Sequence, residues 1–233
     1  MKVSFIIPAY NEEALLVRTL DSVQAAASAV QMAYEVIVVN DASTDGTAEL
    51  ARQRGVRVVD VSCRQIAAVR NAGARAATGD VFIFLDADTV VPEAALRAAL
   101  QALEAGAVGG GARIAMDGVL PAGMRLFFVL FTLFYFRLMK WAAGCFVFVR
   151  REAFEKAGGF DEQYYASEEV HFSQALKRLG KFVIVKPAVV TSSRKIHTYT
   201  VREMLRPVWS VLFHGRGALQ RREGLELWYG KRR

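Results

Sequence analysis

The stretch Val81-Phe82-Ile83-Phe84-Leu85-Asp86-Ala87-Asp88 decides the fold of this 233-residue chain. Its first five residues are all apolar, which predicts a strand buried on both faces, as in a parallel sheet. Two aspartates stand where that strand leaves the sheet. Open parallel sheets bind ligands in the crevice beyond the carboxyl ends of their strands, so both acids are expected at a ligand site.

The first hundred residues around this stretch alternate short β-branched runs with helical stretches. The alternation is typical of βαβ units, and it predicts an α/β fold with a Rossmann-like mixed, mostly parallel sheet flanked by helices. We expect strands over residues 3–8, 35–40, 56–61 and 81–85. Helices are expected from an N-cap at Asn11 to about Ala29, from the loop at 41–47 through Arg54, and over 65–78 and 92–106.

The second half of the chain is less regular. Strands are predicted at 108–116 and 146–149, and an edge strand at 182–185 is expected to end before Pro187, which cannot donate to a ladder. Helices are predicted at 151–157 and 168–179. No internal repeat and no low-complexity linker interrupts the sequence.

Further acidic residues stand at the ends of other predicted elements. They are Glu12-Glu13, Asp41 and Glu168-Glu169. Asp86-Ala87-Asp88 places two oxygen ligands two residues apart, which suits a hard cation such as Mg²⁺ or Mn²⁺ that also bridges phosphate oxygens. These acids predict an enzyme that acts on an activated nucleotide.

Composition and charge narrow the class of protein. Hydrophobic residues make up 53% of the chain, which argues against disorder, and 233 residues can bury a sizeable core. The net charge of +7 favours anionic partners such as phosphates, nucleic acid or acidic lipid. Cys63 and Cys145 lack metal-ligand spacing, so we expect neither a zinc site nor a disulfide framework, and a reducing compartment. The apolar run after Met1 is too short for a cleavable signal peptide.

Two segments point to a membrane surface. Residues 126–136 form an apolar run whose eleven residues are too few for a membrane-spanning helix, which needs about 20. The run therefore predicts either a buried helix or a helix that lies in the headgroup region. From Arg202 onward, eight basic and three acidic residues alternate with aromatic and leucine side chains, as in an amphipathic membrane-surface segment.

Five motifs occur in a fixed order along residues 3–190. They are Pro8-Ala9-Tyr10-Asn11-Glu12-Glu13, Val38-Val39-Asn40-Asp41-Ala42-Ser43-Thr44-Asp45-Gly46-Thr47, Arg70-Asn71-Ala72-Gly73, Leu85-Asp86-Ala87-Asp88-Thr89 and Gly158-Gly159-Phe160-Asp161-Glu162. In this combination the chain resembles the inverting family 2 glycosyltransferases of the GT-A fold. The joint occurrence is far more specific than a lone Asp-x-Asp, which arises often by chance.

The resemblance implies a role for each matching residue. Contacts to the nucleotide sugar are expected from Pro8, Ala9, Tyr10, Glu12, Asp41, Arg70, Asp86 and Ala87. Asp41 is expected to accept a hydrogen bond from the base, since a carboxylate can accept from a pyrimidine imide N–H. Arg70 is expected near the nucleotide or its phosphates, because a planar guanidinium matches such oxygens bidentately.

The resemblance also implies a divalent cation, Mn²⁺ or Mg²⁺. Asp88 and Asp86 are its expected ligands, with His197 as a third, although His171 and His214 compete for that position. The cation would neutralise the charge that develops on the leaving nucleoside diphosphate.

The Glu168-Glu169 pair stands where family members often carry Glu-Asp, whose second acid is the general base. Glu169 is therefore the expected base and Glu168 the alternative, and the additional methylene of Glu shifts where the acceptor hydroxyl can sit. An acidic first helical turn, favoured by the helix dipole, would explain both glutamates without catalysis.

Together these expectations describe a transferase that moves a sugar from a nucleotide sugar, with UDP as the commonest donor nucleotide, to a hydroxyl acceptor. Residues 1–115 would form the nucleotide-sugar half and 116–200 the acceptor and catalytic half of one GT-A domain, followed by a basic segment at 201–233. The apolar run and the basic segment favour a lipid-linked or cell-envelope acceptor and a cytoplasmic protein with peripheral contact at the inner membrane face.

Other functions fit the same sequence less well. A nucleotidyltransferase also pairs acidic metal ligands with an α/β sheet, but it typically has a glycine-rich phosphate loop with a lysine, and residues 8–13 have neither. A non-catalytic nucleotide-binding scaffold is a further alternative. Nucleic-acid binding lacks a recognisable module in this sequence.

Overall fold

The computed structural model of the chain describes residues 1–118, 128–130 and 132–194. The elements are, in chain order, β1 Lys2–Ala9, α1 Glu13–Ala29, β2 Ala33–Asp41, α2 Thr47–Gln53, β3 Arg57–Val61, α3 Ile66–Ala76, β4 Val81–Leu85, β5 Thr89–Val90, α4 Glu93–Glu104, β6 Gly109–Met116, η1 Leu133–Leu138, β7 Phe146–Arg150, α6 Arg151–Ala157, α7 Glu168–Leu179 and β8 Phe182–Thr191. The alternation of strands and helices through α4 confirms the predicted βαβ organisation.

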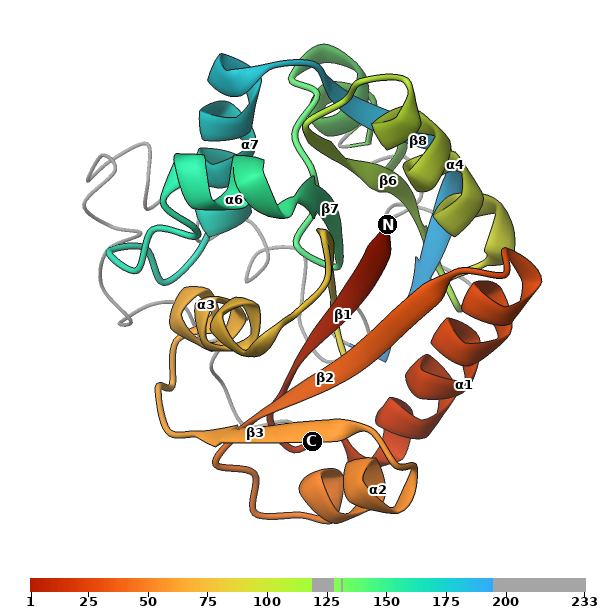
Figure 1. The fold of residues 1–233 in the computed structure, drawn as a ribbon, viewed down its shortest axis with the longest axis vertical. Helices are drawn as coiled ribbons and strands as arrows, with labels where there is room; N and C mark the ends of the chain where they lie inside the picture. The colour runs from red at the N-terminus through yellow and green to blue at the C-terminus, as the bar shows by residue number, and fades with distance from the viewer. Residues whose placement is uncertain (119–127, 131, 195–233) are drawn as a thin grey trace.

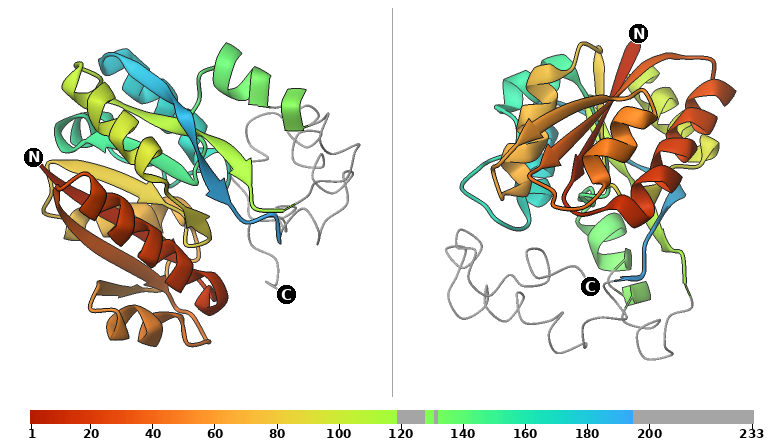
Figure 2. Two further views of the ribbon diagram at one scale, coloured as in Figure 1. Left: turned by 90° about the vertical axis from the view of Figure 1, so that its right-hand side faces the viewer. Right: turned by 90° about the horizontal axis from the view of Figure 1, so that it is seen from below.

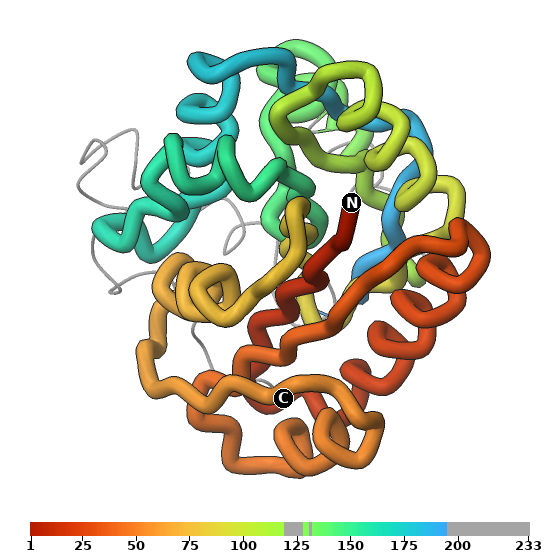
Figure 3. The backbone as a smooth tube through the Cα atoms, in the orientation of Figure 1, coloured from red at the N-terminus to blue at the C-terminus, as the bar shows by residue number. Residues whose placement is uncertain are grey.

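The strands form one mixed sheet in the order β3-β2-β1-β4-β7-β6-β8-β5. β1 runs parallel to both β2 and β4, β2 runs parallel to β3, and β6 runs parallel to β8. β7 is antiparallel to both of its neighbours, β4 and β6. The tube in Figure 3 follows the chain from the central β1 out to β3 and back to the middle of the sheet. The predicted mixed, mostly parallel sheet is confirmed.

Helices cover both faces of this sheet, as Figures 1 and 2 show. Along β1, Phe5 and Ile7 pack with α1 and α4 on one face, whereas Ile6 packs with α3, α6 and α7 on the other. β4 alternates in the same way, with Ile83 and Leu85 on the first face and Phe82 and Phe84 on the second. Because successive side chains of a strand point to opposite faces, a continuous apolar run fits a strand covered on both sides.

An aromatic cluster fills the second face beneath the end of β4. The ring of Phe84 packs edge-on to Phe160 at 4.9 Å and stacks on Phe154 at 5.5 Å, and Phe160 contacts Phe172 of α7 at 4.4 Å. Such aromatic pairs stabilise a core by about 0.5–1.5 kcal/mol beyond their area. The cluster fixes α6 and α7 against the sheet and so sets where α7 begins.

Most element boundaries shift by one or two residues from the expected ones, and three differences go further. β8 continues through Pro187 to Thr191, because a register shift leaves Lys186 and Pro187 out of the ladder with β6, so the missing proline N–H costs no ladder bond. β5 is a two-residue strand that the sequence did not predict, since it forms only by pairing with the end of β8. Asn11 does not cap α1; its backbone is left-handed, with φ of 51°.

The apolar run at 126–136 is described only in part. η1 is a π-helix within which Tyr135 and Phe136 are buried, while Val129, Leu130, Leu133, Phe134 and Leu138 are exposed. This green segment lies at the periphery of the molecule, away from the N-terminus (Figure 2). Among the described residues no helix combines the length and the apolar character that crossing a bilayer requires. The segment 201–233 and His214 lie outside the described residues.

Candidate active site

The carboxyl ends of β1, β2 and β4 lie along one edge of the sheet, because the three strands are parallel neighbours. β2 ends at Asp41, and Asp86 and Asp88 follow β4. Pro8 and Ala9 close β1 opposite Val39 and Asn40 of β2. The structure therefore places the acids of the first half of the chain at the same edge, as predicted from the strand ends.

The loops after β1 and β2 are tied together by short polar side chains. The Asn11 amide N–H donates to Ser43 Oγ at 3.0 Å, and the Asn11 side-chain oxygen accepts from the Thr44 N–H at 2.8 Å. The Glu12 N–H donates to Thr47 Oγ1 at 2.8 Å. These bonds explain why Asn11 and Ala42, with φ of 52°, tolerate left-handed backbone: the surrounding contacts fix the two loops as one unit.

Asp41 is held by the loop that follows β3. One of its carboxylate oxygens accepts from the backbone N–H groups of Cys63 at 2.7 Å and Arg64 at 3.1 Å. The Arg64 guanidinium lies 4.4 Å from the centre of the Tyr10 ring, an attractive cation–π geometry. Asp41, Tyr10 and Arg64 thus form one polar and aromatic corner of the edge.

The Asp86-Ala87-Asp88 turn is anchored on both sides. The Ala87 carbonyl accepts from Thr19 Oγ1 of α1 at 2.8 Å, and the Asp86 N–H donates to the carbonyl of Cys145 at 3.3 Å. Asp88 lies near Arg194, whose guanidinium is 3.9 Å from Asp88 Oδ2. Contacts to α1, to the segment before β7 and to Arg194 thus hold the turn in place.

Arg194 joins Asp88 to the start of α1. It donates to both carboxylate oxygens of Glu12, at 3.2 Å and 2.9 Å. The side chain of Glu12 is only 5% exposed, so this is a largely desolvated, charge-assisted pair. Arg194 brings the acidic residues after β1 and β4 into one network, and it was not among the residues predicted from the sequence.

Arg70 is the centre of a second network. It projects from α3, is 2% exposed, and donates to Glu168, to Asp86 Oδ1 at 3.2 Å and to the Gly144 carbonyl at 2.9 Å. Burial lowers the pKa of the guanidinium, but the carboxylates of Glu168 and Asp86 raise it by a larger amount. The net pKa is therefore above its usual value. Arg70 was expected near the nucleotide or its phosphates; in the structure it is buried and links Asp86 to Glu168.

The two glutamates at the start of α7 have different surroundings. Glu168 is buried and paired with Arg70. Glu169 is partly buried, and Tyr135 Oη lies 3.2 Å from its Oε1. Burial, with the Glu168 carboxylate adding to it, raises the pKa of Glu169 to about 8. A carboxyl group with this pKa is poised to exchange a proton near neutral pH.

The donor set can be tested against a divalent cation. Within residues 1–118, 128–130 and 132–194, no cluster of three or more His, Cys, Asp or Glu side chains could hold a metal. The carboxylates of Asp86 and Asp88 nevertheless fit Mg²⁺ or Mn²⁺, which usually bind through one or two carboxylates and complete their shell with phosphate oxygens and water. His197, the expected third ligand, lies outside the described residues.

Arg194, Arg64 and Tyr135 are the site residues that the sequence analysis missed. Each stands outside the quoted motifs, and each reaches the site only through tertiary contacts to residues far away in the chain, such as Glu12 and Glu169. The available signal for Tyr135 was its hydroxyl within the apolar run at 126–136, where Thr132 carries the other side-chain hydroxyl. His171 competed with His197 in the sequence analysis as a ligand of the cation. In the structure its ring stacks on Tyr164, with ring centres 3.9 Å apart.

Known proteins match the sequence of this chain over its first two thirds. The model of the family described as glycosyl transferase family 2 matches residues 4–158. Over 98 residues, the chain is 43% identical to the undecaprenyl-phosphate 4-deoxy-4-formamido-L-arabinose transferase of Aeromonas hydrophila and 41% identical to that of Pseudomonas paraeruginosa. These matches cover 39% of the chain and only 30% and 29% of the relatives' lengths.

Solved structures share the fold at lower identity. S. aureus TarS in complex with UDP-GlcNAc superposes with a TM-score of 0.66 at 18% identity, over 91% of this chain and 66% of TarS 1–349. The mannosyltransferase PcManGT from Pyrobaculum calidifontis, in complex with GDP-Man and Mn²⁺, superposes with a TM-score of 0.62 at 23% identity, over 82% and 56% of the two chains. With its mixed sheet, its acidic edge and a family match across residues 4–158, this chain belongs to glycosyl transferase family 2 and has the GT-A fold.

Proposed function

We propose that the chain catalyses the inverting, metal-dependent transfer of a sugar from a nucleotide-diphosphate sugar, with UDP as the nucleotide, to a lipid-linked acceptor hydroxyl. The observation that carries this proposal is the chain of ionic contacts that links Asp86, Arg70 and Glu168 beside Glu169. It connects Asp86, one of the two proposed cation ligands, to the neighbourhood of a carboxyl group with a raised pKa. Family membership and the UDP-GlcNAc and GDP-Man bound by the structural neighbours support a nucleotide-sugar donor over a nucleotidyltransferase reaction.

In the proposed reaction, Glu169 accepts the proton of the acceptor hydroxyl as its oxygen attacks the anomeric carbon. The bond from that carbon to the diphosphate oxygen breaks, and its electron pair leaves with the nucleoside diphosphate. One direct displacement inverts the configuration. Glu169 must be ionised for this step, and Glu168 beside it is paired with Arg70.

The donor contacts follow from the same edge. Asp41, Tyr10, Pro8 and Ala9 would contact the nucleotide, and Arg64 adds a cation beside Tyr10. Asp86 and Asp88 would hold the divalent cation, with His197 as a further proposed ligand. The bound cation supplies positive charge to the leaving diphosphate. Residues 1–115 are thereby proposed as the nucleotide-sugar half and 116–200 as the acceptor half.

The lipid-linked nature of the acceptor is proposed from the exposed apolar residues between positions 129 and 138, called the apolar surface below. Its members Val129, Leu130, Leu133, Phe134 and Leu138 are 45–71% exposed, and Arg137 and Lys140 of the same segment are also exposed. An apolar surface next to cations fits the headgroup region of an anionic bilayer. This surface supports peripheral contact with the membrane and a lipid-linked acceptor. The names of the curated relatives, which include undecaprenyl phosphate, also favour a lipid-linked acceptor.

A phosphate acceptor is a second candidate, because the relatives are named for undecaprenyl phosphate. A phosphate oxygen is already ionised at neutral pH and needs no base, whereas a hydroxyl does.

Release of UDP or GDP is measured with a panel of nucleotide sugars and either undecaprenyl phosphate or a lipid-linked saccharide in detergent. Loss of turnover in Glu169→Gln with the saccharide supports the hydroxyl reaction. Full turnover by this variant with undecaprenyl phosphate assigns the phosphate reaction instead, and no turnover of any donor contradicts the proposed function.

A further inference from the structure

Tyr135 connects the apolar surface to the start of α7. Its hydroxyl lies 3.2 Å from Glu169 Oε1 and 3.1 Å from the carbonyl oxygen of Ala142. The residue is 9% exposed, and its ring packs edge-on to Trp141 at 5.5 Å and to Phe136 at 5.3 Å. Packing on two sides therefore fixes the direction in which the hydroxyl points.

Polar contacts along one face of α7 hold the segment that carries Tyr135. Glu169, Ser173 and Lys177 are four residues apart, so they share that face. Ser173 Oγ accepts from the Ala142 N–H at 3.0 Å, and Lys177 Nζ donates to the Met139 carbonyl at 2.6 Å. The contact of Tyr135 with Glu169 is the third of the series, at the N-terminal end of the helix.

The charged surroundings make the Tyr135 hydroxyl a donor. Burial, together with the carboxylates of Glu169 and Glu168, raises the pKa of Tyr135 well above its ordinary value, so its proton stays in place. Cys145 acts in the same direction. The bond from Tyr135 lowers the pKa of Glu169, as does Arg70, while burial and Glu168 raise it.

We propose that Tyr135 is a positioning residue, whose hydroxyl holds the Glu169 carboxylate in the orientation that receives the acceptor's proton. This inference rests on the proposed function, in which Glu169 is the base. One O–H donates to one acceptor at a time: it serves Glu169 while that carboxylate is ionised, and the Ala142 carbonyl once Glu169 carries a proton. Leu133, Phe134 and Leu138 are exposed on the same π-helix. Tyr135 therefore links the exposed apolar surface to the proposed base.

The carboxyl titration of Glu169 tests the inference without any substrate. Protein with ¹³C-labelled glutamate carboxyls is titrated by NMR, and Glu169→Gln identifies the signal. Tyr135→Phe is expected to raise the titration midpoint by about one pKa unit, the effect of losing one hydrogen bond to a carboxylate. Tyr34→Phe is the matched control, because Tyr34 lies near the start of β2, at the end of that strand opposite Asp41, and it should leave the midpoint unchanged. An unchanged midpoint in Tyr135→Phe overturns the inference.

The pH profile of turnover provides the second readout. In Tyr135→Phe, the alkaline rise of kcat is expected at higher pH, with about tenfold lower kcat at pH 7 and an unchanged KM for the donor. In a Glu169→Gln background, the same change should have no further effect. An equal loss in both backgrounds shows a merely structural role and overturns the inference. A shifted NMR midpoint in a protein that turns over no donor contradicts the proposed function, not the contact.

Discussion

The guanidinium of Arg70 lies between the carboxylates of Asp86 and Glu168, which are 82 residues apart in the chain, and it donates to both. One buried cation on α3 therefore fixes both the turn after β4 and the first turn of α7. It sets the separation between the proposed cation ligands and the proposed base. The aromatic cluster supports it from below, with the Phe160 ring centre 5.3 Å from the guanidinium carbon.

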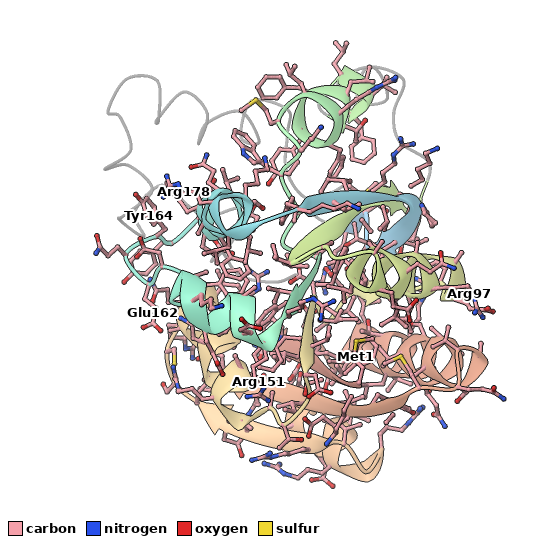
Figure 4. The ribbon with its side chains drawn as sticks, turned by 45° about the horizontal axis from the view of Figure 1, so that its top comes forward. Met1, Arg97, Arg151, Glu162, Tyr164 and Arg178 are labelled. Carbon is pink, nitrogen blue, oxygen red and sulfur yellow. The ribbon has the colours of Figure 1, made fainter. Side chains whose placement is uncertain are left out.

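Removing this cation is expected to destabilise the fold strongly. Arg70→Met leaves Glu168 buried without its partner, and breaking such a pair costs about 3–5 kcal/mol. Arg97→Met is the control, because the pair of Arg97 with Glu93 is half-exposed and contributes at most about 0.5 kcal/mol. Figure 4 shows Arg97 at the outer edge of the molecule. Urea unfolding measures both; equal midpoints would show that Arg70 does not organise the site.

Turnover with a hydroxyl acceptor is expected to rise with pH through about 8, because Glu169 is active only when it has lost its proton and its pKa is raised to about 8. The slope is positive, since the ionised fraction grows as the pH increases through this value. Glu169→Gln should lower kcat by about 10²–10⁴ above pH 8 and abolish the rise with pH. Glu155→Gln, an exposed change on α6, is the control. A profile that is flat between pH 6 and 9 contradicts the role of Glu169.

The exposed apolar surface should carry the protein to anionic bilayers. Phe134→Glu combined with Leu138→Glu introduces charges where apolar side chains are proposed to enter the headgroup region, so binding to vesicles of anionic phospholipid should fall at least tenfold. Leu179→Glu, at an exposed leucine at the end of α7, is the matched control. Flotation with vesicles measures binding, and equal flotation of the double variant and the unchanged protein would exclude this surface as the contact.

Periodicity and strand ends were sufficient for the fold. The apolar run at 81–85 is buried on both faces, and the acid that ends β2 and those that follow β4 lie along one edge. The predicted end of β8 before Pro187 was wrong, because a register shift lets the strand continue past this residue. Local pattern cannot anticipate such a shift, since it depends on the partner strand.

The site was predictable to the extent that its residues belong to local motifs. The positions of Asp86, Asp88 and Glu169 follow from the elements that carry them, whereas their partners Arg194 and Tyr135 come from distant segments without a motif. The burial of Arg70 also depends on tertiary packing, because a helical arginine has the same sequence signature whether it is solvated or enclosed. The roles of these residues in the reaction stay predictions.

The central claim is that Asp86 and Asp88 bind a divalent cation together with a nucleoside diphosphate. Its most direct test is the thermal unfolding midpoint with UDP, with and without Mn²⁺, in the unchanged protein, in Asp88→Asn and in the control Asp80→Asn, which alters the opposite end of β4. A ligand at 100 times its Kd stabilises the native state by about 2.7 kcal/mol. The account predicts a UDP-dependent rise in the midpoint that requires Mn²⁺, persists in Asp80→Asn and is lost in Asp88→Asn. The same rise in Asp88→Asn, or none in any of the three proteins with UDP or GDP, would contradict it.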